Sequence, residues 1–252
     1  MDIKAYLKRI DYRGPSLPTY QTLVELQEAH LLAVPFENLN ISLGRTISLD
    51  EKTLFHKIVT QQRGGFCYEL NGLFAALLQA LGFQVSMLSA GVAHQEGGFG
   101  PEFDHMALLV QVEGPWLVDV GFGDSFYRPL ALEEWGEHAQ AGYKYRLLRN
   151  GSYWTLQRRP DGTTDEAWEN QYRFTLQAHQ LVDYAEMCHY HQTSPQSLFT
   201  RKRTCTRMTR SGRVTVSDMR LIITEHGKRN ERLLTGQEEY TEALWEYFGI
   251  TL

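Results

Sequence analysis

The spacing of apolar residues changes near residue 83, and this change limits the folds open to the chain. Up to that point apolar residues recur at helical spacing, which predicts helices over 19–32, from about 51 to before Gly64, and from Cys67 to Gly82. Beyond it the pattern favours strands over 84–92, 105–112, 116–120, 143–148, 153–158 and 172–176. The tail adds strands over 213–217 and 219–224 and a helix over 237–248. Helices followed by strands are typical of an α+β fold.

Ser48 and Glu51 have the spacing of a capping box, which predicts the start of the second long helix. Gly82 is the expected C-terminal cap of the third helix, since glycine adopts the left-handed backbone at helix ends. That third helix opens at Cys67, directly after Gly64, Gly65 and Phe66.

Cys67 is the first candidate for chemistry. Backbone N–H groups and the helix dipole at a helix N-terminus favour negative charge, which lowers a thiol pKa and gives a nucleophilic thiolate. The two preceding glycines allow a sharp turn and close approach of a substrate carbonyl. A buried structural cysteine is an equally open interpretation of this segment.

His105 and Asp119 are candidates for the base and the carboxylate that a cysteine nucleophile requires. His105 borders one apolar strand and Asp119 lies within the next, so a buried Asp119 needs a polar partner. The alternatives are an ordinary core or surface histidine and a carboxylate that binds turn amides. A simple hairpin pairs Asp119 with a residue near Leu109, about 13 Å along the strand from His105. The triad therefore requires a shifted register or a bulge.

Several segments together resemble the arylamine N-acetyltransferase family, bacterial type, in the family's order. They are 34–39 (VPFENL), 63–72 (RGGFCYELNG), 105–110 (HMALLV), 118–123 (VDVGFG) and 193–199 (TSPQSLF). The resemblance implies acetyl-coenzyme A as co-substrate and arylamines or hydrazines as acceptors. It also implies a papain-like or transglutaminase-type core with a helical bundle (1–83), a β-barrel (84–190) and an α/β lid (191–252).

The same resemblance implies roles for particular residues. Cys67 would accept the acyl group, His105 would be the base and Asp119 its orienting carboxylate. Phe36, Tyr68 and Phe122 would line the substrate pocket, and Gly121 and Gly123 would lie near the coenzyme A phosphates. The chain departs from the family before the Ser-Pro motif, where an Asn is frequent and 188–192 reads CHYHQ.

Composition narrows the remaining function classes. A formal net charge of -5 argues against a general nucleic-acid binder. No apolar run approaches the length of a membrane span, and no secretory leader follows Met1. The three cysteines lack a pairing pattern, so we expect a reducing cytoplasm. The cysteine and histidines of 188–191 lack a second ligand pair, so we expect no metal.

Two other function classes stay open. A cysteine hydrolase or an amide-forming enzyme would use the same triad without coenzyme A. A non-catalytic binding relative would keep the fold, although the presence of Cys67, His105 and Asp119 argues against it.

Overall fold

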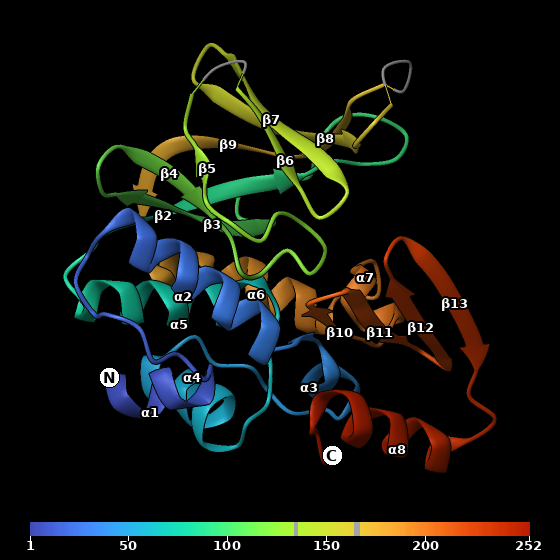
Figure 1. Ribbon diagram of the computed structural model, residues 1–252. Helices are drawn as coiled ribbons and strands as arrows, with labels where there is room; N and C mark the ends of the chain where they lie inside the picture. Colours follow the sequence, from blue (N-terminus) through green and yellow to red (C-terminus); the bar gives the residue numbers. More distant parts are fainter. Residues whose placement is uncertain (134–135, 164–166) are drawn as a thin grey trace.

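The computed structural model describes residues 1–133, 136–163 and 167–252. It combines a helical N-terminal part, a barrel of strands, and a C-terminal sheet with one long helix. In Figure 1 the barrel lies above the N-terminal helices, and the C-terminal sheet stands beside them. The α+β class predicted from the sequence is confirmed. The domain boundaries at 83/84 and 190/191 stay predictions.

The N-terminal part contains six helical segments. They are α1 (Ile3–Arg9), α2 (Tyr20–Ala33), α3 (Leu39–Ser42), α4 (Glu51–Phe55), the π-helix η1 (His56–Thr60) and α5 (Cys67–Ala80). Helix α2 begins after Thr19, whose side chain accepts a hydrogen bond from the Thr22 amide. Gly82 follows the end of α5 with φ of +91°, as expected for a helix-terminating glycine. The predicted helices over 19–32 and from Cys67 are confirmed.

The predicted capping box at Ser48 is wrong. Asp50 is the N-cap of α4 and accepts from the Thr53 amide at 2.9 Å, while the Ser48 hydroxyl donates to Asp50. An Asp side chain caps as well as a Ser side chain, and here it lies next to the first helical residue. The helix then widens into η1, which turns Lys57 inward.

The barrel is an antiparallel eight-stranded sheet in the order β5-β4-β3-β2-β9-β8-β7-β6, and it is nearly closed (Figure 1). Its strands are β2 (Gln84–Val92), β3 (His105–Gln111), β4 (Pro115–Val118), β5 (Leu130–Ala131), β6 (Glu137–Gln140), β7 (Tyr143–Asn150), β8 (Tyr153–Pro160) and β9 (Glu169–His179). In β3, Ala107 and Leu109 pack inside the barrel, whereas Leu108 and Val110 pack against the helices. Burial on both faces explains why this strand is an unbroken apolar run.

The C-terminal part starts with η2 (Leu181–Tyr184), α6 (Ala185–Thr193) and α7 (Leu198–Arg201). A second sheet follows with β10 (Thr204–Thr209), β11 (Gly212–Ser217), β12 (Arg220–Glu225) and β13 (Lys228–Leu233), and α8 (Gln237–Phe248) covers it. The short strand β1 (Phe36–Glu37) joins this sheet by pairing with β10. The sequence missed β13 because all its residues are exposed and charged or polar ones dominate, so no apolar alternation marks it.

A buried cluster of four charged residues joins η1, β1, α5 and the segment before α5. The Lys57 ammonium contacts both carboxylate oxygens of Glu69 at 2.8 and 2.9 Å and lies 3.6 Å from Glu37. The Arg63 guanidinium donates to Glu37 at 2.8 Å. Burial works to raise the pKa of Glu37, but the charges of Lys57 and Arg63 hold it below its usual range. The cluster is electrically balanced only while all four residues are present.

We predict that Lys57→Met lowers the free energy of unfolding by about 3–5 kcal/mol, because the buried Glu69 carboxylate loses its cation. Lys144→Met is the matched control, since Lys144 binds Glu137 at the surface and should change stability by less than about 1 kcal/mol. Denaturant unfolding of both variants measures the difference. Equal stability of the two variants would contradict the prediction.

Candidate active site

Cys67 is the first residue of α5, and the preceding turn is held by close backbone packing. A Cβ on Gly64 would collide with the Pro35 carbonyl oxygen, so only glycine fits there. The Glu37 amide donates to the Gly65 carbonyl at 2.8 Å, and the Phe66 amide donates to Glu69 at 3.1 Å. The glycines therefore allow the chain to pass close to β1, and the Glu69 carboxylate fixes the start of the helix.

His105 and Asp119 are brought together at the barrel end next to α5. Nε2 of His105 lies 2.7 Å from Oδ2 of Asp119, and both side chains are buried. The simple hairpin register expected from the sequence is wrong by two residues. The turn covers 112–114, and Leu108 pairs with Val118. Asp119 is thus opposite Ala107, only two residues from His105, and diagonal side chains at this spacing can meet.

Asn71 completes the contacts of Asp119, although the sequence interpretation gave it no role. Its amide donates to Asp119 Oδ1 at 2.9 Å and to the Met106 carbonyl at 2.6 Å, while its oxygen accepts from the Val120 amide. The Gly121 amide also donates to Asp119 Oδ1, at 2.8 Å. A polar residue one helical turn after Cys67, in a helix where apolar residues dominate, was the available signal.

The backbone of Cys67 packs directly against the loop that carries Asp119. A Cβ on Gly121 would lie 2.6 Å from Nδ2 of Asn71 and 2.8 Å from Cα of Cys67. Gly121 therefore lets α5 and the barrel loop make contact. This backbone contact between Gly121 and Cys67 holds Cys67 beside the His105–Asp119 pair.

The expected low pKa of the Cys67 thiol is not found. Burial raises its pKa well above the usual range, and the negative charges of Asp104 and Asp119 act in the same direction. The Met106 amide, which hydrogen-bonds the sulfur, opposes them. The helix N-terminus is thus outweighed by removal from water, and ionisation of this thiol requires a proton acceptor close by.

Phe122 and Tyr172 form an aromatic wall beside the imidazole. The ring centroids of both lie 5.1 Å from that of His105, and they lie 5.2 Å from each other. The sequence did not single out Tyr172, whose hydroxyl is buried near Asp119. Burial, and then the charge of Asp119, raise the pKa of Tyr172 well above its usual range, so the hydroxyl stays neutral.

The other predicted site residues lie near this centre in different settings. Phe36 is half-buried, and its ring contacts the position of a Cβ on Gly123, which has φ of +89°. The Gly123 carbonyl accepts from the Arg213 guanidinium. Tyr68 is fully buried, and its hydroxyl donates to the Phe103 carbonyl at 2.6 Å. Binding roles for Phe36, Tyr68, Gly121 and Gly123 stay predictions.

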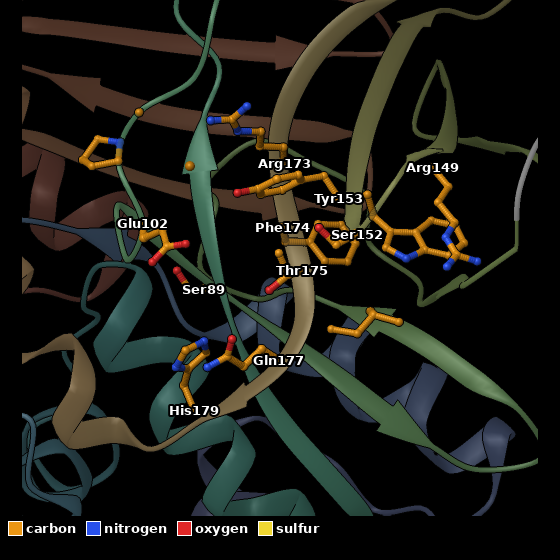
Figure 2. Close-up of a pocket in the computed structure, with 15 residues that line it drawn as sticks. Ser89, Glu102, Arg149, Ser152, Tyr153, Arg173, Phe174, Thr175, Gln177 and His179 are labelled. Atoms are coloured by element: carbon orange, nitrogen blue, oxygen red, sulfur yellow. The ribbon is translucent and has the colours of Figure 1, made fainter.

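A separate cavity lies on β2, β8 and β9 and is drawn in Figure 2. Arg173, Tyr153 and His179 are among its lining residues, whereas Cys67, His105 and Asp119 are not. One of its lining residues, Ser89, connects it to the active-site strand, because the Ser89 hydroxyl accepts from the Phe103 amide at 2.7 Å, two residues before His105.

Both the sequence and the fold are similar to those of known proteins. A family profile described as N-acetyltransferase matches residues 19–252. The chain is 33% identical to a chicken arylamine N-acetyltransferase, pineal gland isozyme NAT-10, over the whole of this chain and 95% of that protein. The chain belongs to the arylamine N-acetyltransferase family.

Two further related proteins bear on function. The solved structure of Mycobacterium marinum arylamine N-acetyltransferase in complex with CoA superposes with a TM-score of 0.90 at 32% identity, covering 99% of this chain and 93% of that chain. Proansamycin X synthase of Amycolatopsis mediterranei is 32% identical over 95% of this chain and 94% of its own. The expected papain-like cysteine core is confirmed by this similarity.

Within residues 1–133, 136–163 and 167–252, no three His, Cys, Asp or Glu side chains are placed to hold a metal ion. The helices in those same ranges are too short or too polar to cross a membrane.

We predict that Gly121→Ala lowers the free energy of unfolding by about 1–3 kcal/mol and reduces turnover, because the new methyl group must displace α5 from the barrel loop. Gly236→Ala is the control, since nothing lies within 4 Å of a Cβ there. Its cost should stay within about 1 kcal/mol, as for a helix N-cap change. Thermal unfolding and an activity assay compare the two; an alanine tolerated at 121 as well as at 236 would refute the close-packing argument.

Proposed function

We propose that this protein transfers acetyl groups from acetyl-coenzyme A to arylamines and hydrazines through an acetyl-Cys67 intermediate. The 2.7 Å contact between His105 and Asp119, beside a cysteine at the start of α5, carries this proposal. Family membership and the CoA complex of the Mycobacterium marinum relative support the choice of acyl donor.

In the first half-reaction the Cys67 proton moves to His105, and the sulfur attacks the thioester carbonyl carbon. Because burial opposes a lone thiolate, the ionised sulfur forms only as a pair with the imidazolium. The carbon–sulfur bond to coenzyme A then breaks, and its thiolate takes the proton from His105. Backbone amides at the start of α5, including that of Tyr68, hold the negative oxygen of the intermediate.

In the second half-reaction the amine nitrogen attacks the acetyl-cysteine carbonyl, and His105 accepts the amine proton. Collapse of the intermediate releases the amide and returns the sulfur to Cys67, which regains its proton from His105. Phe122 and Phe36 stack on the aryl ring and exclude water, which competes as a nucleophile. The coenzyme A phosphates lie near the turn at Gly121 and Gly123, as the family resemblance implies.

We place this chemistry in a reducing compartment, the cytoplasm. The three cysteines, Cys67, Cys188 and Cys205, are all buried and unbridged. A working thiol in an oxidising compartment would be exposed to disulfide formation.

A second candidate is an amide-forming enzyme or hydrolase that uses the same three residues without coenzyme A. The similarity to Proansamycin X synthase favours it, because that relative is named for a synthase reaction and matches about as well as the acetyltransferases. The two candidates differ in the acyl donor, since only the acetyltransferase takes its acyl group from acetyl-coenzyme A.

We predict that brief mixing with acetyl-coenzyme A adds one acetyl group to Cys67 and that an aromatic amine then removes it. Intact-protein mass spectrometry measures both steps, and Cys67→Ala, which should stay folded, gains nothing. Steady-state rates should give parallel double-reciprocal lines, as expected for two half-reactions at one site. A folded wild type that stays unmodified would move the assignment to the second candidate.

We predict that Asp119→Asn lowers turnover by about 10³–10⁴-fold. The new amide oxygen would take the place of Oδ1, which accepts from Asn71 and Gly121, so the amide NH₂ would face Nε2 of His105. The imidazole must then carry its proton on Nδ1 and cannot accept another. Unfolding free energy should also fall by about 1–3 kcal/mol. Asp161→Asn, in an exposed turn, is the matched control for both measurements.

A further inference from the structure

A second carboxylate–imidazole pair lies beside the active site. Asp104 directly precedes His105, and its Oδ1 is 3.3 Å from Nε2 of His191 on α6. The His191 side chain is 8% exposed and the Asp104 side chain 18%. His191 belongs to the segment 188–192, where the sequence departs from the pattern frequent in the family. The mechanism above uses neither residue.

The Ser197 hydroxyl lies beside the imidazole of His191. It accepts from the Phe199 amide, and its hydrogen is available to Nδ1 of His191, 3.1 Å away. When the hydroxyl donates to Nδ1, the proton of a neutral imidazole is on Nε2, which faces Asp104. Nε2 has no hydrogen bond of good geometry, so its attraction to Asp104 depends mainly on charge and is greatest for the imidazolium.

Asp104 and His191 are held in place from several elements. The Val92 amide donates to Oδ2 of Asp104 at 3.1 Å, and the Tyr68 hydroxyl approaches the Asp104 carbonyl at 3.2 Å. The Tyr68 ring of α5 lies over the imidazole with 6.1 Å between centroids, and Tyr190 of α6 meets it edge-on. From α7 the imidazole meets the uncharged Ser197 and Phe199. Asp104 is thus the ionised group at this imidazole.

The charge of Asp104 matters to Cys67. After burial, it is the strongest influence that raises the pKa of the Cys67 thiol, ahead of Asp119. A cation next to Asp104 offsets that influence, because the field of a compensated pair falls off faster than that of a single charge. His191 is the group at contact distance from Asp104 that can carry this charge.

We propose that His191 is a positioning residue for the reaction: it compensates the charge of Asp104 and thereby makes the Cys67 thiolate easier to form. The inference rests on the proposed nucleophilic role of Cys67 but not on the identity of the acyl donor. The segment 188–192, which departs from the pattern frequent in the family, thereby gains a chemical role. An apolar residue at position 191 would leave the negative charge of Asp104 without a cation beside it.

The test is the rate of Cys67 alkylation by iodoacetamide between pH 5 and 9, followed by mass spectrometry of the peptide that contains Cys67. His191→Gln should slow alkylation by about three- to tenfold at pH 6–7. The deficit should be largest where the imidazole is charged and should vanish where it is neutral. His189→Gln, on the exposed side of the same helix, is the matched control and should react as the wild type does.

The double variant separates charge compensation from a merely structural role. In an Asp104→Asn background, His191→Gln should have no further effect on alkylation, because there is no charge to offset. An equal slowing in both backgrounds, or an unchanged rate in His191→Gln at all pH values, would overturn the inference. Acetylation by acetyl-coenzyme A is measured on the same samples, so failure of the acyl donor is distinguished from failure of the role of His191.

Discussion

The Asp119 carboxylate is the interaction on which the active site depends. Its two oxygens accept from a helix side chain, a loop amide and an imidazole at the start of β3. A buried carboxylate is tolerable only when it is this well satisfied. By taking one donor from Asn71 of α5 and one from His105 of the barrel, it ties the two halves of the site into one geometry. Gly121 allows the close approach that this requires.

Burying a charged side chain costs free energy, and the other buried charges near Cys67 each have a partner of opposite sign. Lys57 and Arg63 are matched by Glu37 and Glu69, and these pairs fix the segment that leads to Cys67. Such clusters contribute more to a unique geometry than to net stability. Cys67 differs from them, because burial raises the pKa of its thiol well above the usual range. In the proposed mechanism, charge forms on this sulfur when its proton moves to His105.

Membership of the arylamine N-acetyltransferase family narrows the possible reactions, but it does not by itself determine the acyl donor. A solved relative with bound CoA and a relative named as a synthase align with this chain at the same identity and over nearly all of its length. The same core thus occurs in proteins named for different reactions. Function must therefore be argued from the site, as fold alone does not determine it. The pair Asp104–His191 is one such local feature of this site.

The sequence by itself determined the helix that opens at Cys67, most of the barrel strands and the family, because these depend on local periodicity and on short motifs. It also indicated His105 and Asp119. Only the tertiary structure decided that these two meet, since a hairpin register depends on turn geometry that the pattern leaves open. The role of Asn71 and the high pKa of Cys67 likewise came from packing, because burial and hydrogen-bond partners belong to the assembled fold and not to any single segment.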